Sequence, residues 1–112
     1  MTTSPTTIPA AEALALHDLL SPSDRGISSR NLAKAAGGSL TLFAFGAGEK
    51  LAEHTTPFEA LVLVLEGSLT LVVGGVRVDA GPGTIVRLPA QVPHAVEAPA
   101  AARMLLVTLR DQ

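Results

Sequence analysis

The sequence predicts an all-β domain, folded as a closed barrel or as two packed sheets. Short apolar runs rich in valine, leucine and threonine recur along the chain, and glycine or proline separates most of them. Many short strands at even spacing, with almost no helix, are typical of such architectures. The 112 residues have room for one domain with a modest core. About eight strands are expected, at residues 26–33, 39–45, 60–67, 68–73, 76–80, 84–89, 94–98 and 102–110.

Ahead of the first strand, the sequence predicts a flexible tail and one short helix. Residues 1–8 begin with MTTSPTT, which is small, polar and interrupted by Pro5, so we expect an irregular tail. From Pro9 to Leu20 the residues are good helix formers. Proline suits a first helical turn, and SPSD after Leu20 ends the helix. Residues 9–112 are therefore expected to form the single domain.

Two adjacent glycines give the strongest local signal. Gly74 and Gly75 lie between the strand-like runs LTLVV and VRVDA. A two-residue hairpin turn needs positive φ angles, which glycine adopts without steric cost. We expect residues 68–73 and 76–79 to form an antiparallel pair.

The run ALVLVL, residues 60–65, is apolar at every position and so demands burial on both faces. One face can fill the interior of a barrel. The other face, with Leu61, Leu63 and Leu65, needs a second layer. Because exposed apolar patches of this kind are uncommon on monomers, the sequence favours a homodimer. The alternative is cover by the N-terminal helix or by the strand at residues 26–32.

Charge and composition exclude several partners and sites. The chain has 8 basic and 10 acidic residues, a formal net charge of −2, and lacks the basic surface that nucleic acid or an anionic membrane requires. It has no cysteine, which excludes disulfides, thiolate metal ligands and cysteine nucleophiles. Neither a secretion signal nor the roughly 20 apolar residues of a membrane span is present, so we expect a cytoplasmic protein. A phosphate loop and a serine nucleophile elbow are also missing.

Two groups of glycine, histidine and proline are regularly spaced. The first is Gly48, five residues and His54, with EG at 66–67, and the second is Gly83, five residues and Pro89, with His94 five further on. With these motifs, residues 38–109 resemble small single-domain members of the RmlC-like cupin superfamily. The resemblance implies a double-stranded β-helix, the jelly-roll or cupin barrel, with the ligand inside it. In many members, two histidines and a glutamate of the first motif and one histidine of the second bind a metal.

The chain departs from the family pattern at three positions. Thr56 stands where the second histidine is expected, Ala60 where the glutamate is expected, and Gln91 where the second motif has glycine. Glu59 is one residue away from the expected carboxylate. Because successive side chains of a strand point to opposite faces, Glu59 faces outward if Ala60 faces inward, unless a bulge intervenes.

We expect His54 and His94 to point into one cavity, with Thr56, Phe58 and Gln91 as further pocket residues. Two imidazoles fall short of the three or four ligands of a typical transition-metal site. Any divalent Fe, Mn, Ni, Cu or Zn held by the two histidines should be weakly bound. Apolar lining is expected from Phe43 or Phe45, Phe58, Val62, Val64 and Leu88.

Two functions follow from this reasoning. The first is binding of a small, largely apolar molecule whose polar or anionic end meets His54 and His94. The alternative is a metal-dependent cupin enzyme, an oxygenase or isomerase, with an incomplete histidine-based site. The fold does not choose between them, and the sequence identifies no catalytic residue.

Two arginines and a third histidine are the remaining candidates for functional residues. Arg87 and Arg103 lie within apolar strands. They could face inward and bind an anionic ligand, or face outward towards solvent or a carboxylate such as Glu97 or Asp79. His17 is expected on the surface of the N-terminal helix.

Overall fold

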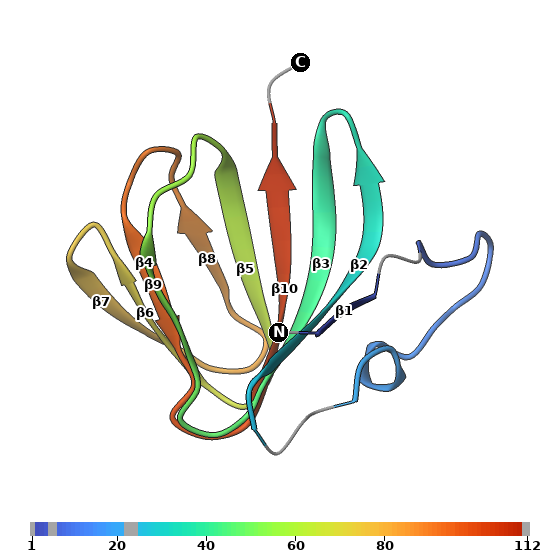
Figure 1. The fold of residues 1–112 in the computed structure, drawn as a ribbon, viewed down its shortest axis with the longest axis horizontal. Coiled ribbons are helices and arrows are strands. Elements are labelled where there is room, and N and C mark those ends of the chain that lie inside the picture. Colours follow the sequence, from blue (N-terminus) through green and yellow to red (C-terminus); the bar gives the residue numbers. More distant parts are fainter. Residues whose placement is uncertain (1, 5–6, 22–24, 111–112) are drawn as a thin grey trace.

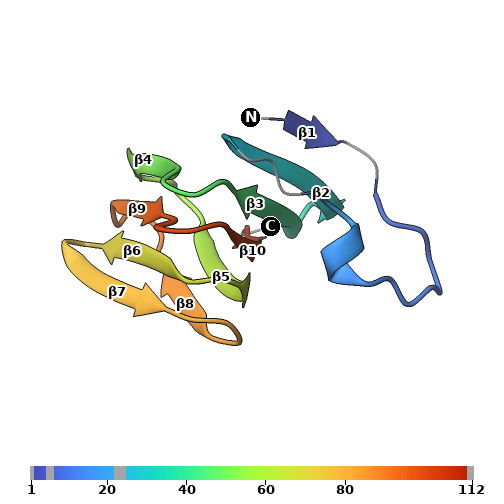
Figure 2. The ribbon, with the colours of Figure 1, turned by 90° about the horizontal axis from the view of Figure 1, so that it is seen from below.

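Two β-sheets face each other and enclose the core (Figure 2). The computed structural model describes residues 2–4, 7–21 and 25–110. Most strands form a fan-shaped body, and the N-terminal segment runs beside it, next to β2 (Figure 1). The all-β prediction is confirmed, and each of the predicted strand ranges overlaps an observed strand.

The larger sheet has six strands in the order β1-β2-β3-β10-β5-β8. β1 is parallel to β2, and the other neighbours are antiparallel. The first strand differs from the predicted irregular tail, of which residues 1, 5 and 6 lie outside the described residues. The strands are β1 (Thr2–Ser4), β2 (Ile27–Ala35), β3 (Gly38–Phe45), β5 (Glu59–Glu66), β8 (Ile85–Leu88) and β10 (Ala102–Leu109).

The smaller sheet has four antiparallel strands in the order β4-β9-β6-β7. Gly74 and Gly75 have φ angles of 56° and 82° and join β6 to β7, which confirms the predicted hairpin. The sequence did not predict β4, which carries His54. The strands are β4 (Lys50–His54), β6 (Leu69–Val73), β7 (Val76–Ala80) and β9 (His94–Glu97).

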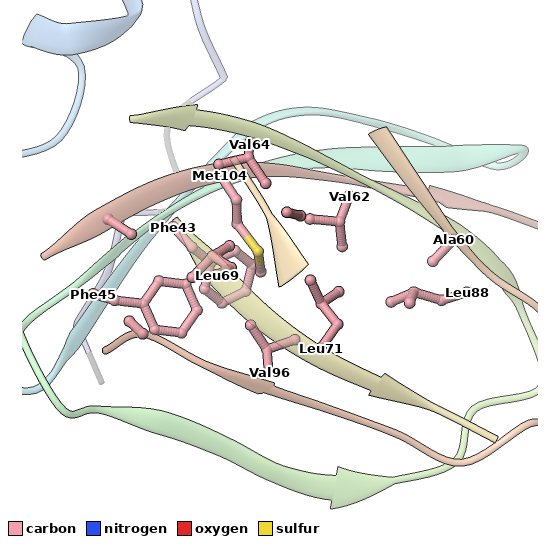
Figure 3. Packing of buried hydrophobic residues seen from close by; sticks show 13 residues of the cluster. Phe43, Phe45, Ala60, Val62, Val64, Leu69, Leu71, Leu88, Val96 and Met104 are labelled. Carbon is pink, nitrogen blue, oxygen red and sulfur yellow. The ribbon is translucent and has the colours of Figure 1, made fainter. Parts of the chain in front are cut away.

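Alternating side chains from both sheets fill the core (Figure 3). On β5, Ala60, Val62 and Val64 are buried, and Leu69 and Leu71 of β6 are buried in the same cluster from the opposite sheet. Because the apolar residues of both inner faces meet, water is excluded over most of the interface, which is the main source of stability in such folds.

The outer face of the larger sheet is also apolar. Leu61, Leu63 and Leu65 of β5 point there and are half-buried. The N-terminal segment reaches this sheet through two arginines: Arg30 donates to the Leu19 carbonyl oxygen, and Arg103 donates to that of His17. These contacts lie at β2 and at the start of β10, so the segment is anchored to one part of this face.

The predicted helix at residues 9–20 is wrong. Within the described residues, this segment contains only η1 (Leu16–Asp18), a single 3-10 turn. Ala11 has a φ of 60°, which interrupts a right-handed helix. Short helices depend on tertiary packing more than on helix propensity. This segment contacts the sheet without forming a regular helix. No helix in the described part of the chain is long and apolar enough to cross a membrane.

Candidate functional site

A cavity of about 200 Å³ lies between the two sheets. Its walls come from β3, β5, β8 and β10 on one side and from β4 and β9 on the other. Apart from two imidazoles, the lining is apolar. The lining residues are Phe43, Leu51, His54, Val62, Leu88, His94, Val96, Met104 and Leu106.

His54 and His94 form the polar end of this cavity. They lie opposite each other in the β4–β9 pair, and their ring centroids are 4.4 Å apart with the ring planes at 69°. His54 is exposed, whereas His94 is only 6% exposed. The structure brings the two histidines together at one cavity.

A β-bulge turns His54 towards the cavity. Leu51 pairs with Val96 and His54 pairs with His94, so three steps along β4 match two steps along β9. In a regular strand, residues 51 and 54 would point to opposite faces. The extra residue lets both Leu51 and His54 face inward, as bulges commonly do near binding sites.

Backbone carbonyl groups hold both rings. His54 Nδ1 lies 2.9 Å from the Ala52 oxygen, and His94 Nδ1 lies 3.3 Å from the Val92 oxygen. Burial lowers the pKa of His94; the hydrogen bond to Val92 opposes this shift, and the nearby His54 adds to it. Burial therefore favours the neutral form of the His94 imidazole.

Three other residues expected in the pocket lie elsewhere. The Thr56 hydroxyl donates to the Phe58 carbonyl oxygen, and the Gln91 backbone N–H donates to the Thr56 carbonyl oxygen. The Gln91 side chain is exposed, at a backbone φ of 65°. Phe58 packs under the Arg110 guanidinium, 4.8 Å from the ring centroid. These residues belong to the connections before β5 and β9, which run outside the cavity, and the prediction placed them too far inward.

Glu59 faces away from the cavity, as strand alternation predicted. It forms a two-pronged ion pair with Arg87, with both N–O distances 2.8 Å. The hydrogen bonds from Arg87 lower the pKa of Glu59. Ala60, one residue further, points inward and is buried. The ion pair also settles the orientation of Arg87, which binds this cross-strand carboxylate rather than a ligand in the barrel.

Arg103 also faces outward. Its guanidinium is almost fully buried and lies 3.1 Å from the Glu66 carboxylate. Glu66 also contacts His17 Nδ1 at 2.6 Å, and this hydrogen bond lowers the pKa of Glu66. His17 is exposed, as predicted, although it lies on a 3-10 turn instead of a helix. The three residues tie the N-terminal segment to the sheet and do not reach the cavity.

The expected apolar lining is correct for Phe43, Val62 and Leu88. Phe45 and Val64 lie in the core but not at the cavity. Sequence reasoning missed Leu51, Val96, Met104 and Leu106. The alternation of Met104 and Leu106 along the last strand is a usable signal for the same face. Leu51 and His54 also share a face, but the bulge breaks the alternation between them, so the sequence pattern does not show it.

Comparison with known proteins decides the family. A model of the cupin domain matches residues 41–108. The chain belongs to the cupin family. A crystal structure of a conserved protein of unknown function from Streptococcus pyogenes is similar, with 26% identity, a TM-score of 0.89, and 96% of this chain and 95% of that chain covered.

Other solved cupins have the same fold. A cupin superfamily protein from Desulfitobacterium hafniense has 26% identity and a TM-score of 0.87, over 96% of this chain and 99% of that one. Salicylate 1,2-dioxygenase from Pseudoaminobacter salicylatoxidans has 16% identity and a TM-score of 0.70, over 74% of this cupin and 26% of the enzyme, and shares the fold alone. A search of curated proteins gave no match.

The residues of this cupin do not fit the four-ligand metal cage of the family. In the described part of the chain, no three histidine or carboxylate side chains lie together in a group that could hold a metal ion. Thr56 directs its hydroxyl to a backbone carbonyl, and Ala60 has no donor atom. Two imidazoles are the nitrogen donors at the cavity, and the Met104 thioether beside them is a soft donor that suits Cu(I). Weak metal binding by His54 and His94 stays a prediction.

Proposed function

We propose that this cupin binds a small, largely apolar molecule in the cavity between its sheets. The observation that carries the proposal is the composition of the wall: seven apolar side chains and two histidines at one end. Small-molecule sites are typically apolar with a few convergent polar groups. In this site, His54 and His94 contact the polar end of the ligand, and the remaining wall excludes water from the rest.

The size of the cavity supports a ligand of about one ring. Apolar cavities of about 150 Å³ bind a benzene-sized molecule. The cavity of this cupin, at about 200 Å³, accepts such a ring with one substituent. Buried apolar surface contributes roughly 25 cal/mol per Å², so a ligand of this size binds with modest affinity.

The alternative from the sequence is a metal-dependent oxygenase or isomerase. For Fe, Mn, Ni or Zn it requires a third ligand from substrate or solvent, because His54 and His94 are the only nitrogen or oxygen donor side chains among the residues that line the cavity. Elemental analysis of protein purified without an affinity tag separates the two functions. A stoichiometric metal, lost in both His54→Ala and His94→Ala, would favour the enzyme.

Toluene is the probe that tests the binding proposal. We expect it to shift the NMR signals of the cavity residues during a titration of the whole protein. Leu106→Phe should abolish these shifts, because the larger ring fills the cavity that Leu106 lines. Leu105→Phe is the matched control, since its side chain points to the opposite face of β10 and should leave binding intact.

Two outcomes would contradict the proposal. One is the absence of toluene binding up to millimolar concentration in protein whose spectrum is that of the folded domain. The other is equal binding by the wild type and Leu106→Phe, which would place the toluene site outside the cavity.

We also propose that a second copy of this chain covers the outer face of the larger sheet. Leu61, Leu63 and Leu65 are half-buried there, and Ile85 and Leu109 are 59% and 48% exposed. A second copy offers the same apolar face, so a two-fold arrangement is self-complementary. The nearby ion pair of Arg87 and Glu59 is neutral within one subunit and needs no partner charge.

Light scattering tests this assembly. The wild type should have twice the 11.4 kDa mass of one chain at micromolar concentration. Leu63→Glu should give monomers, because it places a charge within the apolar contact. Val76→Glu is the control, since Val76 is 63% exposed on β7 of the other sheet. A monomeric wild type would overturn the proposal.

A further inference from the structure

The tautomer of both histidines follows from their hydrogen bonds. A carbonyl oxygen can only accept, so the Nδ1 atoms that contact the carbonyl groups of Ala52 and Val92 must each carry a proton. A neutral imidazole has one ring proton. Nε2 of each neutral ring is therefore a hydrogen-bond acceptor with a free lone pair.

The cavity offers these acceptors no donor. Its other lining side chains are those of leucine, valine, phenylalanine and methionine, none of which donates a hydrogen bond. In the described part of the chain, the hydrogen bonds of His54 and His94 both engage Nδ1, and neither uses Nε2. His94 is only 6% exposed, and both imidazoles line the cavity. A ligand that keeps water from such an acceptor and offers it no donor loses a hydrogen bond.

We infer that the cavity selects uncharged ligands whose polar end is a hydrogen-bond donor, such as a phenol or an aromatic alcohol. This inference rests on the proposed function and names the class of ligand. A hydroxyl group satisfies an Nε2 lone pair, whereas an ether or methyl group leaves it without a partner. A carboxylate adds its own lone pairs and a charge in an apolar cavity, which is unfavourable. The anionic end that the sequence left open is thus disfavoured.

Phenol and toluene are the matched probes, since they differ only in the donor. At about pH 8 the hydroxyl of phenol keeps its proton, because phenolic groups have pKa values near 10. Toluene is transferred more easily from water, so the two dissociation constants are compared as a ratio in the wild type and in variants. We expect His94→Leu to reduce the preference for phenol over toluene by roughly five- to tenfold, the effect of one hydrogen bond.

Two further variants sharpen the comparison. His94→Gln retains an acceptor oxygen and should preserve part of the preference, whereas His54→Leu should reduce it as His94→Leu does. Benzoate, which is ionised at this pH, should bind more weakly than either probe. Nitrogen-15 NMR of the imidazole rings provides a reading that needs no variant, since it distinguishes a protonated Nδ1 from a protonated Nε2.

The outcomes separate this inference from the proposed function. If toluene binds but the ratio is the same in the wild type and the leucine variants, the cavity function stands and the donor preference is wrong. Rings protonated at Nε2, or benzoate as the tightest probe, would also overturn the preference. If neither toluene nor phenol binds, the proposed function fails, and this inference fails with it.

Discussion

Gly67→Ala is expected to lower the free energy of unfolding by about 2–4 kcal/mol. Gly67 has a φ of 69°, a left-handed conformation that is costly for alanine. A Cβ atom at this position would lie 2.4 Å from the Ala101 carbonyl oxygen and 3.0 Å from the Ala102 Cα atom. Both obstacles are backbone atoms, which cannot move without disturbing the start of β10. Urea denaturation monitored by circular dichroism measures the loss.

Gly75→Ala is the matched control. Gly75 also has a positive φ, 82°, but a Cβ atom there meets nothing within 4 Å. Its cost should be only that of the backbone conformation, about 1 kcal/mol. If both variants lose the same free energy of unfolding, the close approach of the Ala101 carbonyl oxygen to Gly67 contributes nothing to the destabilisation.

Phe45→Ala is expected to destabilise the protein by about 3–5 kcal/mol. Phe45 is completely buried and stacks with Phe43 at a centroid distance of 6.2 Å (Figure 3). Removing its ring leaves a cavity. The surrounding strands cannot close it, because the hydrogen bonds within each sheet fix the strand positions. The loss appears as a lower urea midpoint with little change in the slope of the transition.

Phe58→Ala provides the comparison for this variant. Phe58 is half-buried, and the Arg110 guanidinium lies over its ring. Such exposed cation–π contacts contribute about 0.5–1 kcal/mol, so the total loss should stay well below that of Phe45→Ala. A larger loss in Phe58→Ala would contradict the assignment of Phe45 to the core and Phe58 to the periphery.

The sequence predicts most of this fold because its strands carry strong local signals. The continuous apolar run of β5 and the paired glycines between β6 and β7 are signals carried by neighbouring residues alone. β4 was missed, since KLAEH is short, has one apolar residue of any size and lacks β-branched or aromatic residues. For the N-terminal segment, the sequence predicted a helix that the structure does not contain. Its helix-forming composition is outweighed by contacts with Arg30 and Arg103, which are distant in sequence.

The candidate site was predictable only in part. Motif spacing identified His54 and His94. The structure brings them together because His54 ends β4, His94 begins β9 and the two strands pair. The same reasoning placed Thr56, Phe58 and Gln91 at the pocket, since sequence proximity to a pocket residue was taken as spatial proximity. The paths of their loops depend on hydrogen bonds such as that from the Gln91 backbone N–H to the Thr56 carbonyl oxygen. No local sequence pattern predicts such a hydrogen bond.

The bulge in β4 means that the chemistry of the cavity depends on strand register as well as on residue identity. With Ala52 and Glu53 together opposite one residue of β9, an imidazole faces the interior. A straightened β4 of the same sequence would turn His54 outward and bring the Glu53 carboxylate inward. The bulge thus decides whether an imidazole or a carboxylate lines the cavity, and the contact of His54 Nδ1 with the Ala52 carbonyl oxygen belongs to the bulged arrangement.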